Sequence, residues 1–145
     1  MDGFFDRFSL AGQVAVVTGG GRGIGAGIAL DFARAGAKVA VAARRTQEIE
    51  AVAAEICDMG GEAIAVTTDV TDRAALEHLA DETESALGPL SCWVNNAGGS
   101  TMRMPMTELP REEFLRTIEL NLTAVFDGCM IAAQRIRRGS IINIS

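Results

Sequence analysis

The sequence predicts an α/β fold, a doubly wound parallel sheet with strand order 3-2-1-4-5. Two observations support this prediction. Short apolar runs alternate strictly with longer segments of helical periodicity, which is the pattern of consecutive βαβ units. A turn rich in glycine, TGGGRGIG at 18–25, directly follows the first apolar run, QVAVV at 13–17.

Five strands are expected where the apolar runs lie. Their near-continuous apolarity is typical of parallel strands that are buried on both faces, and we expect the last of them to be buried like the others. The expected strands are 13–18, 37–43, 62–68, 90–96 and 140–145.

Four helices are expected between these strands, at 24–35, 46–60, 71–88 and 110–138. Gly36 follows the first helix and Gly60 terminates the second, as glycine commonly does at the end of a helix. Thr46 is the expected N-cap of the second helix, and Thr71 or Asp72 that of the third. Proline at 110 suits the first turn of the last helix, and arginines lie in its last turn.

The composition indicates a globular protein that acts on a small molecule. Of 145 residues, 48% are hydrophobic and 22% are charged, and the formal net charge is −6. An acidic chain is a poor match for nucleic acid or an anionic membrane, since both bind clustered positive charge. Three scattered cysteines resemble the reduced thiols of a cytoplasmic protein. We expect no metal site and no nucleic-acid or membrane partner.

The glycine-rich turn predicts a binding site for a dinucleotide. A strand, a glycine turn and a helix in succession place the free N–H groups of the helix at the carboxyl end of the sheet, where they bind pyrophosphate. A plain tight turn is the alternative, but the complete βαβ context of a Rossmann fold favours the cofactor site. The candidate residues here are Thr18, Gly19, Gly21, Arg22, Gly23, Ile24 and Gly25.

The spacing T-G-x-x-x-G-x-G, with further motifs, resembles the short-chain dehydrogenase/reductase family. Four more features carry the resemblance, which runs from about Leu10 to Ser145. They are Asp69-Val70 after the third strand, Asn95-Asn96-Ala97-Gly98 after the fourth, Asn121 in LNLTAVF, and IINIS at 141–145.

The resemblance implies a role for each of these residues. Asp69 would accept a hydrogen bond from the adenine amino group, with Val70 beside the ring; an N-cap box in TDVTD is the alternative. Asn95 and the backbone of Ala97 and Gly98 would line the adenosine ribose and steady the central sheet, although NNAG could be only a turn. Asn121 would hold a helix kink open by bonding back to the helix backbone and relay protons to a catalytic lysine; otherwise it is a poor helix former.

The end of the second strand favours NADP over NAD. An NAD enzyme usually has a carboxylate at this position for the ribose 2′-hydroxyl, whereas this chain has Ala43 followed by Arg44 and Arg45. A guanidinium suits a 2′-phosphate, and Arg22 lies inside the glycine turn. A solvated arginine pair at a strand end is the alternative.

The resemblance also implies a serine, a tyrosine and a lysine for proton transfer. The chain has no tyrosine, and its single lysine is Lys38 at the start of the second strand. The family's serine would be the residue after Ser145, so we expect the chain to be the first part of a longer family member. Asn121 and Ser145 are also a few residues closer than is usual in the family, which indicates omitted residues near Arg137 and Arg138 or a tight turn.

The expected function is NADP-dependent reduction of a carbonyl, or the reverse oxidation of an alcohol, by a full-length homo-oligomer (dimer or tetramer). The alternative within the same fold is a non-catalytic sensor that binds NADP. A methyltransferase is disfavoured, because its second strand normally ends in a carboxylate and here Ala43 precedes two arginines. The expected domain is a single dinucleotide-binding Rossmann domain over residues 1–145, incomplete at its carboxyl end.

Overall fold

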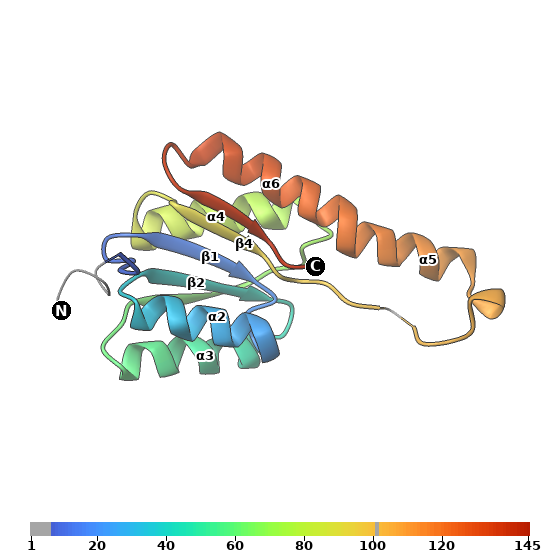
Figure 1. The fold of residues 1–145 in the computed structure, drawn as a ribbon, viewed down its shortest axis with the longest axis horizontal. Helices are drawn as coiled ribbons and strands as arrows, with labels where there is room; N and C mark the ends of the chain where they lie inside the picture. The colour runs from blue at the N-terminus through green and yellow to red at the C-terminus, as the bar shows by residue number, and fades with distance from the viewer. Residues whose placement is uncertain (1–6, 101) are drawn as a thin grey trace.

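The protein is described by a computed structural model over residues 7–100 and 102–145. Five parallel strands form one sheet with the order β3-β2-β1-β4-β5 (Figure 1). The strands are β1 Val14–Thr18, β2 Lys38–Ala43, β3 Ala63–Thr67, β4 Cys92–Asn95 and β5 Ser140–Asn143. The predicted fold class and strand order are confirmed.

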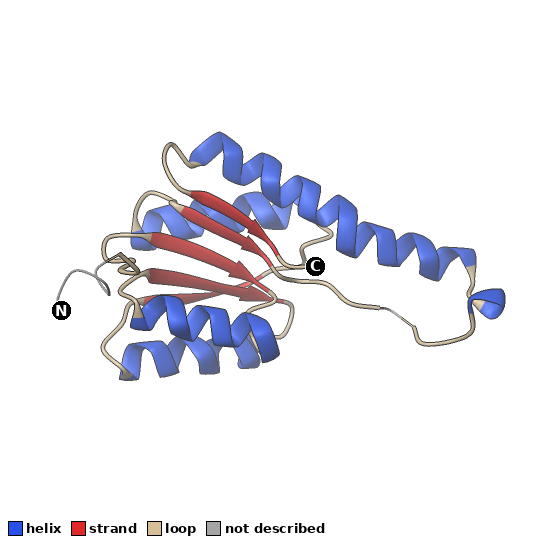
Figure 2. Cartoon of the chain, viewed as in Figure 1, coloured by secondary structure: helices blue, strands red, loops and turns tan. Residues whose placement is uncertain are grey.

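Helices cover both faces of the sheet (Figure 2). They are α2 Gly23–Arg34, α3 Thr46–Asp58, α4 Arg73–Leu87, the short 3₁₀ helix Met106–Glu108, α5 Arg111–Ile118, a π-helical turn Glu119–Thr123 and α6 Ala124–Arg135. Helices α2 and α3 pack on one face, and α4 and α6 on the other, while α5 extends beyond the sheet.

The two faces of the sheet have separate apolar cores because side chains alternate along each strand. Val16 and Trp93 are fully buried in the core under α4 and α6. Val17 and Val41 are fully buried in the core under α2 and α3. Burial on both faces explains why these strands read as continuous apolar runs.

The glycines after α2 and α3 end these helices as predicted. Gly36 has φ 100° and Gly60 has φ 86°, a left-handed conformation that side chains disfavour. The amide of Gly36 donates to the carbonyl of Ala33, and that of Gly60 to Cys57, each at 2.9 Å.

The prediction that Thr46 is the N-cap of α3 is wrong. The capping position belongs to Arg45, and Thr46 is the first helical residue. The hydroxyl of Thr46 lies 2.8 Å from the hydroxyl of Thr67 at the end of β3. Thr46 is already helical, so its hydroxyl makes this tertiary contact instead of a cap.

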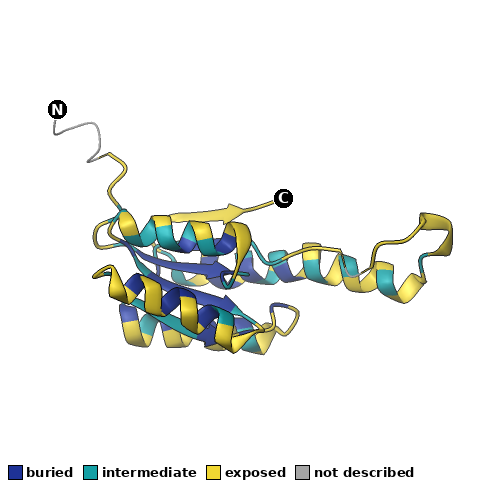
Figure 3. Cartoon of the chain, turned by 90° about the horizontal axis from the view of Figure 1, so that it is seen from below, coloured by how far each residue is buried: buried dark blue, intermediate teal, exposed yellow. Residues whose placement is uncertain are grey.

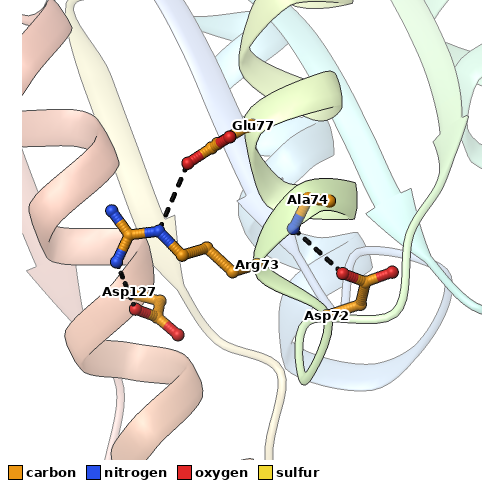
Figure 4. A network of polar contacts seen from close by, with 5 residues as sticks. All are labelled: Asp72, Arg73, Ala74, Glu77 and Asp127. Atoms are coloured by element: carbon orange, nitrogen blue, oxygen red, sulfur yellow. Dashed lines mark hydrogen bonds and ion pairs between the residues drawn. The ribbon is translucent and has the colours of Figure 1, made fainter.

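Helix α4 begins after Asp72, one of the two predicted caps. The Asp72 carboxylate accepts a hydrogen bond from the amide of Ala74 at 2.9 Å. The neighbouring Arg73 forms ion pairs with Glu77 at 3.2 Å and with Asp127 of α6 at 2.9 Å (Figure 4). The start of α4 is therefore fixed both by a cap and by a link to the next helix on the same face.

Replacing Asp72 with alanine is expected to destabilise the protein by about 1 kcal/mol, because an orphan amide of α4 loses its acceptor. Asp72→Asn is the matched control, since asparagine caps helices about as well as aspartate. Denaturant unfolding of the two variants measures the difference. Equal loss of stability in both would show that the carboxylate charge, not the cap, is what matters.

The helix predicted for 110–138 ends earlier than expected, and the kink that the family resemblance implies at Asn121 is present. A π-helical turn at Glu119–Thr123 interrupts the helix, which ends at Arg135, since Ile136 is extended with φ −76° and ψ 110°. Asn121 explains the interruption because its side chain donates to the carbonyl of Thr117, four residues back, at 2.8 Å. A tight connection at 136–139 then leads into β5.

The prediction of a buried fifth strand is also wrong. All four residues of β5 are exposed, as its yellow ribbon shows in Figure 3. In the sheet, β5 lies at the edge and pairs with β4. Its apolar side chains, Ile141 and Ile142, therefore remain exposed among the described residues. None of the described helices is long and apolar enough to span a membrane.

Candidate functional site

A cavity of about 400 Å³ lies at the carboxyl ends of the first four strands, and we call it the cleft. Turns that are far apart in the sequence meet there because parallel strands share one carboxyl edge. Its size is in the range of small-molecule sites. The lining residues are Gly19, Gly21, Arg22, Gly23, Ile24, Gly25, Ala43, Arg44, Arg45, Glu48, Thr68, Asp69, Val70, Asn96, Ala97, Gly98 and Leu120.

The glycines of the first turn allow the backbone to approach its neighbours closely. Gly19 has φ 64°, and a Cβ there would lie 2.8 Å from the Cα of Ala97. A Cβ on Gly25 would overlap the carbonyl oxygen of Gly19. The turn therefore folds tightly between the start of α2 and the loop after β4, and only glycine fits at these two positions.

The amino end of α2 opens on the cleft. Arg22 occupies the capping position, and its side chain makes no capping hydrogen bond. The first N–H groups of a helix have no partner within the helix. Gly23, Ile24 and Gly25 belong to this first turn and line the cleft, so it presents donors suited to an anion such as a phosphate.

Thr18 lies beneath the cleft and supports its wall. Its hydroxyl donates to the carbonyl of Val94 at 3.2 Å and accepts from the amides of Asn96 and Ala97 at 3.0 and 3.1 Å. It is buried and outside the lining. The predicted site residue therefore positions the loop after β4.

Asn96 is a lining residue to which sequence reasoning assigned no role. Its side-chain amide donates to the carbonyls of Thr18 and Gly19, at 3.0 and 3.2 Å. These two bonds join the loop after β4 to the glycine turn after β1. Asn96 belongs to the NNAG motif, in which the predicted side-chain role was assigned to Asn95.

Asn95 does not line the cleft, in contrast to the sequence expectation. It is buried, accepts from the indole N–H of Trp93 at 2.8 Å, and donates to the side chain of Asn143 at 2.9 Å. Asn95 lies on the same face of β4 as Trp93, two residues before it, and is the register partner of Asn143 in β5. Asn95 links the two strands, as expected from the other half of its predicted role.

Asp69 lines the cleft directly after β3, with the buried Val70 beside it. The amide and hydroxyl of Thr71 donate to its Oδ1 at 3.0 and 2.7 Å. Partial burial tends to raise the pKa of Asp69, but these two bonds and the charge of Arg44 outweigh it and lower the pKa. Asp69 is thus an ionised acceptor at the cleft, and the cap of α4 is Asp72 instead.

Three arginines and two carboxylates set the charge of the cleft. Arg22, Arg44 and Arg45 face Glu48 and Asp69, so the cleft has an excess of positive charge within a chain of net charge −6. One guanidinium is already paired, since Arg45 Nη1 lies 2.7 Å from Glu48 Oε1.

Glu48 is the second lining residue that sequence reasoning missed. It lies in the first turn of α3, three residues after Arg45, and under Gly21, where an added Cβ would come 2.9 Å from the Cβ of Glu48. The i, i+3 spacing from Arg45 was the available signal.

Asn121 lies outside the cleft lining and joins the π-helical turn to the loop after β4. Its Oδ1 accepts from the amide of Gly99 at 2.9 Å, and its Nδ2 donates to the carbonyl of the same residue at 2.8 Å. The expected bond back to the helix is present at Thr117. Gly98 packs so closely that a Cβ there would lie 2.8 Å from Asn121 Oδ1.

Lys38 lies away from the cleft, as its sequence position predicts. It is the first residue of β2, and its ammonium pairs with Glu62 at 2.9 Å. The amino ends of parallel strands are opposite the edge that forms the cleft. The single lysine therefore cannot serve chemistry in the cleft.

The sequence is similar to those of curated proteins over nearly its whole length. The 7alpha-hydroxysteroid dehydrogenase of Escherichia coli (strain K12) is 37% identical over 143 residues, which are 97% of this chain and 55% of that protein. The chain thus spans about half the length of the curated relatives it matches.

Solved structures agree in fold. A 7 alpha-hydroxysteroid dehydrogenase complexed with NADH and 7-oxo glycochenodeoxycholic acid has a TM-score of 0.91 and 37% identity, over 97% of this chain and 55% of that one. A short chain dehydrogenase from Burkholderia cenocepacia J2315 in complex with NADP has a TM-score of 0.87 and 35% identity, over 92% and 55%. The sequence model of the short chain dehydrogenase family matches residues 13–145, and the chain therefore belongs to this family.

Proposed function

We propose that the protein is an NADP-dependent oxidoreductase that transfers a hydride between nicotinamide and a carbonyl or alcohol substrate. The observation that carries the proposal is the charge at the cleft. Ala43 ends β2 with no carboxylate, and Arg22, Arg44 and Arg45 line the cavity around it.

The choice of NADP rests on this chain's own residues. The two structural relatives named above are complexed with different nucleotides, one with NADH and the other with NADP, so family membership leaves both open. A guanidinium makes strong charge-assisted hydrogen bonds to phosphate. A carboxylate at the end of β2 would instead serve a 2′-hydroxyl, and Ala43 offers none.

The other lining residues would hold the rest of the dinucleotide. The glycine turn and the amino end of α2 suit the pyrophosphate. We assign the adenine amino group to the Asp69 carboxylate, the adenine ring to Val70, and the adenosine ribose to the backbone of Ala97 and Gly98. The close approach at Gly19 and Gly25 supports this fit, since a Cβ at either position would collide with the backbone of the turns that shape the cleft.

When bound, the nicotinamide supplies or accepts the hydride, and a proton donor must complete the reaction. Residues 1–145 contain no tyrosine, the donor that the family resemblance implies. We assign Asn121 a supporting role, in which it fixes the loop after β4 through Gly99. Carbonyl chemistry is therefore proposed for the whole protein.

A spectrophotometric assay of NADPH oxidation by the protein at its natural length tests the proposed function. We expect turnover with at least one carbonyl class among sugars, steroids, quinones and acyl ketones. Residues 1–145 expressed alone are expected to give no turnover, because no tyrosine is present to donate the proton. NADPH binding by the natural-length protein without turnover of any carbonyl would favour the alternative, a non-catalytic sensor.

Assembly and location form part of the same proposal. Large apolar side chains are exposed along α5, the π-helical turn and α6, which supports a homo-oligomer, a dimer or tetramer. These residues are Leu115, Ile118, Leu122, Phe126 and Met130.

The free cysteines Cys57, Cys92 and Cys129 suit the reducing cytoplasm.

A further inference from the structure

The ion pair between Arg45 and Glu48 divides the three arginines of the cleft into two kinds. Arg45 is held by a carboxylate at 2.7 Å, and this carboxylate itself lines the cavity. Arg44 is near Asp69, whose Oδ1 also accepts two bonds from Thr71. Glu48 thus lies in the same turn of the chain as its arginine, three residues after Arg45, whereas Asp69 comes from the loop after β3.

Glu48 is well fixed, whereas Arg45 can move. Glu48 is in the first turn of α3, where the helix dipole favours a negative charge. Its side chain is 32% exposed and packs under Gly21, while that of Arg45 is 64% exposed. An exposed pair of this kind is weak and readily exchanged. An anion that reaches the cleft would therefore compete with Glu48 for the guanidinium of Arg45.

This competition distinguishes the two nucleotides. A 2′-phosphate gains from Arg45 only if that side chain leaves Glu48, and the bared carboxylate then repels the phosphate. A 2′-hydroxyl is uncharged and requires no such exchange. We propose that Glu48 is a specificity-determining residue, an inference that rests on the proposed function. By holding Arg45, Glu48 limits how strongly the cleft prefers NADP over NAD.

Direct titration of the natural-length protein with NADPH and with NADH tests the inference. Glu48→Gln is expected to tighten NADPH binding about threefold to fivefold, the range that an exposed ion pair can supply, and to leave NADH binding within about twofold. The gain should shrink in high salt, which screens exposed charges. Glu50→Gln is the matched control, on the same helix but outside the cleft, and should change neither affinity.

A second variant tests whether Glu48 acts through Arg45. In an Arg45→Gln background, the Glu48→Gln change should no longer tighten NADPH binding. An unchanged ratio of the two affinities in Glu48→Gln, or the same gain with Arg45 removed, would overturn the inference while leaving the proposed function intact. Failure of the unmodified protein to bind either nucleotide would overturn both.

Discussion

Replacing Gly25 with alanine is expected to weaken nucleotide binding by at least about tenfold. A Cβ at this position would overlap the carbonyl oxygen of Gly19 and crowd the side-chain amide of Asn96. The added Cβ therefore forces the backbone of Gly19 and the side chain of Asn96 to move. The hydrogen bond between these two residues joins the two turns that shape the cleft. Such overpacking costs about 1–3 kcal/mol, and both the stability and the geometry of the turn should suffer.

Gly27→Ala is the control, because it lies two residues further along the same helix and an added Cβ there meets nothing within 4 Å. Alanine in an open helical position should stabilise α2 by about 0.5–1 kcal/mol and leave binding unchanged. NADPH titration and thermal unfolding of both variants measure the contrast. A Gly25→Ala protein that binds NADPH like the unmodified one would contradict the assignment of the glycine turn.

Arg44→Asp is expected to narrow or reverse the preference for NADPH over NADH. The change removes a charge-assisted contact to the 2′-phosphate, which contributes about 1.5–3 kcal/mol. It also places a carboxylate next to Ala43, where an NAD enzyme has its acidic residue. Titration of the variant with both nucleotides gives the ratio.

Arg138→Asp controls for the change in net charge, since Arg138 lies in the connection 136–139 at the amino end of β5, opposite the edge that forms the cleft. It should leave the ratio unaltered. An equal shift in both variants would mean that long-range electrostatics, rather than contact at Arg44, sets the preference.

The sequence predicted those features of the fold that local patterns determine. Alternating apolar runs and helical segments predicted the five strands, the doubly wound dinucleotide-binding fold predicted their order, and Gly36 and Gly60 predicted two helix ends. The same logic located the cleft, because a glycine turn between strand and helix has few other uses. Gly19, residues 21–25, 43–45 and 69–70 line the cleft together, since parallel strands end at one edge.

Features that depend on contacts between distant segments escaped prediction. Thr46 was misjudged because its hydroxyl meets Thr67, 21 residues away. The family resemblance implied a kink at Asn121, but the bonds of this side chain to Gly99 depend on how the loop after β4 folds back.

The direction of side chains was a second feature that the sequence motif did not predict. Asn95 and Asn96 are equivalent in the motif, yet one faces β5 and the other the glycine turn. Alternation along a strand separates the two side chains, but the partner that each one meets depends on the tertiary fold.

The affinity of the unmodified natural-length protein for NADPH relative to NADH, measured by direct titration at one salt concentration, tests the central claim most directly. The arginines around Ala43 predict that NADPH binds at least about tenfold more tightly, because a charge-assisted bond to the 2′-phosphate supplies more than the roughly 1.4 kcal/mol that a tenfold ratio requires. Equal affinities for the two nucleotides would contradict it.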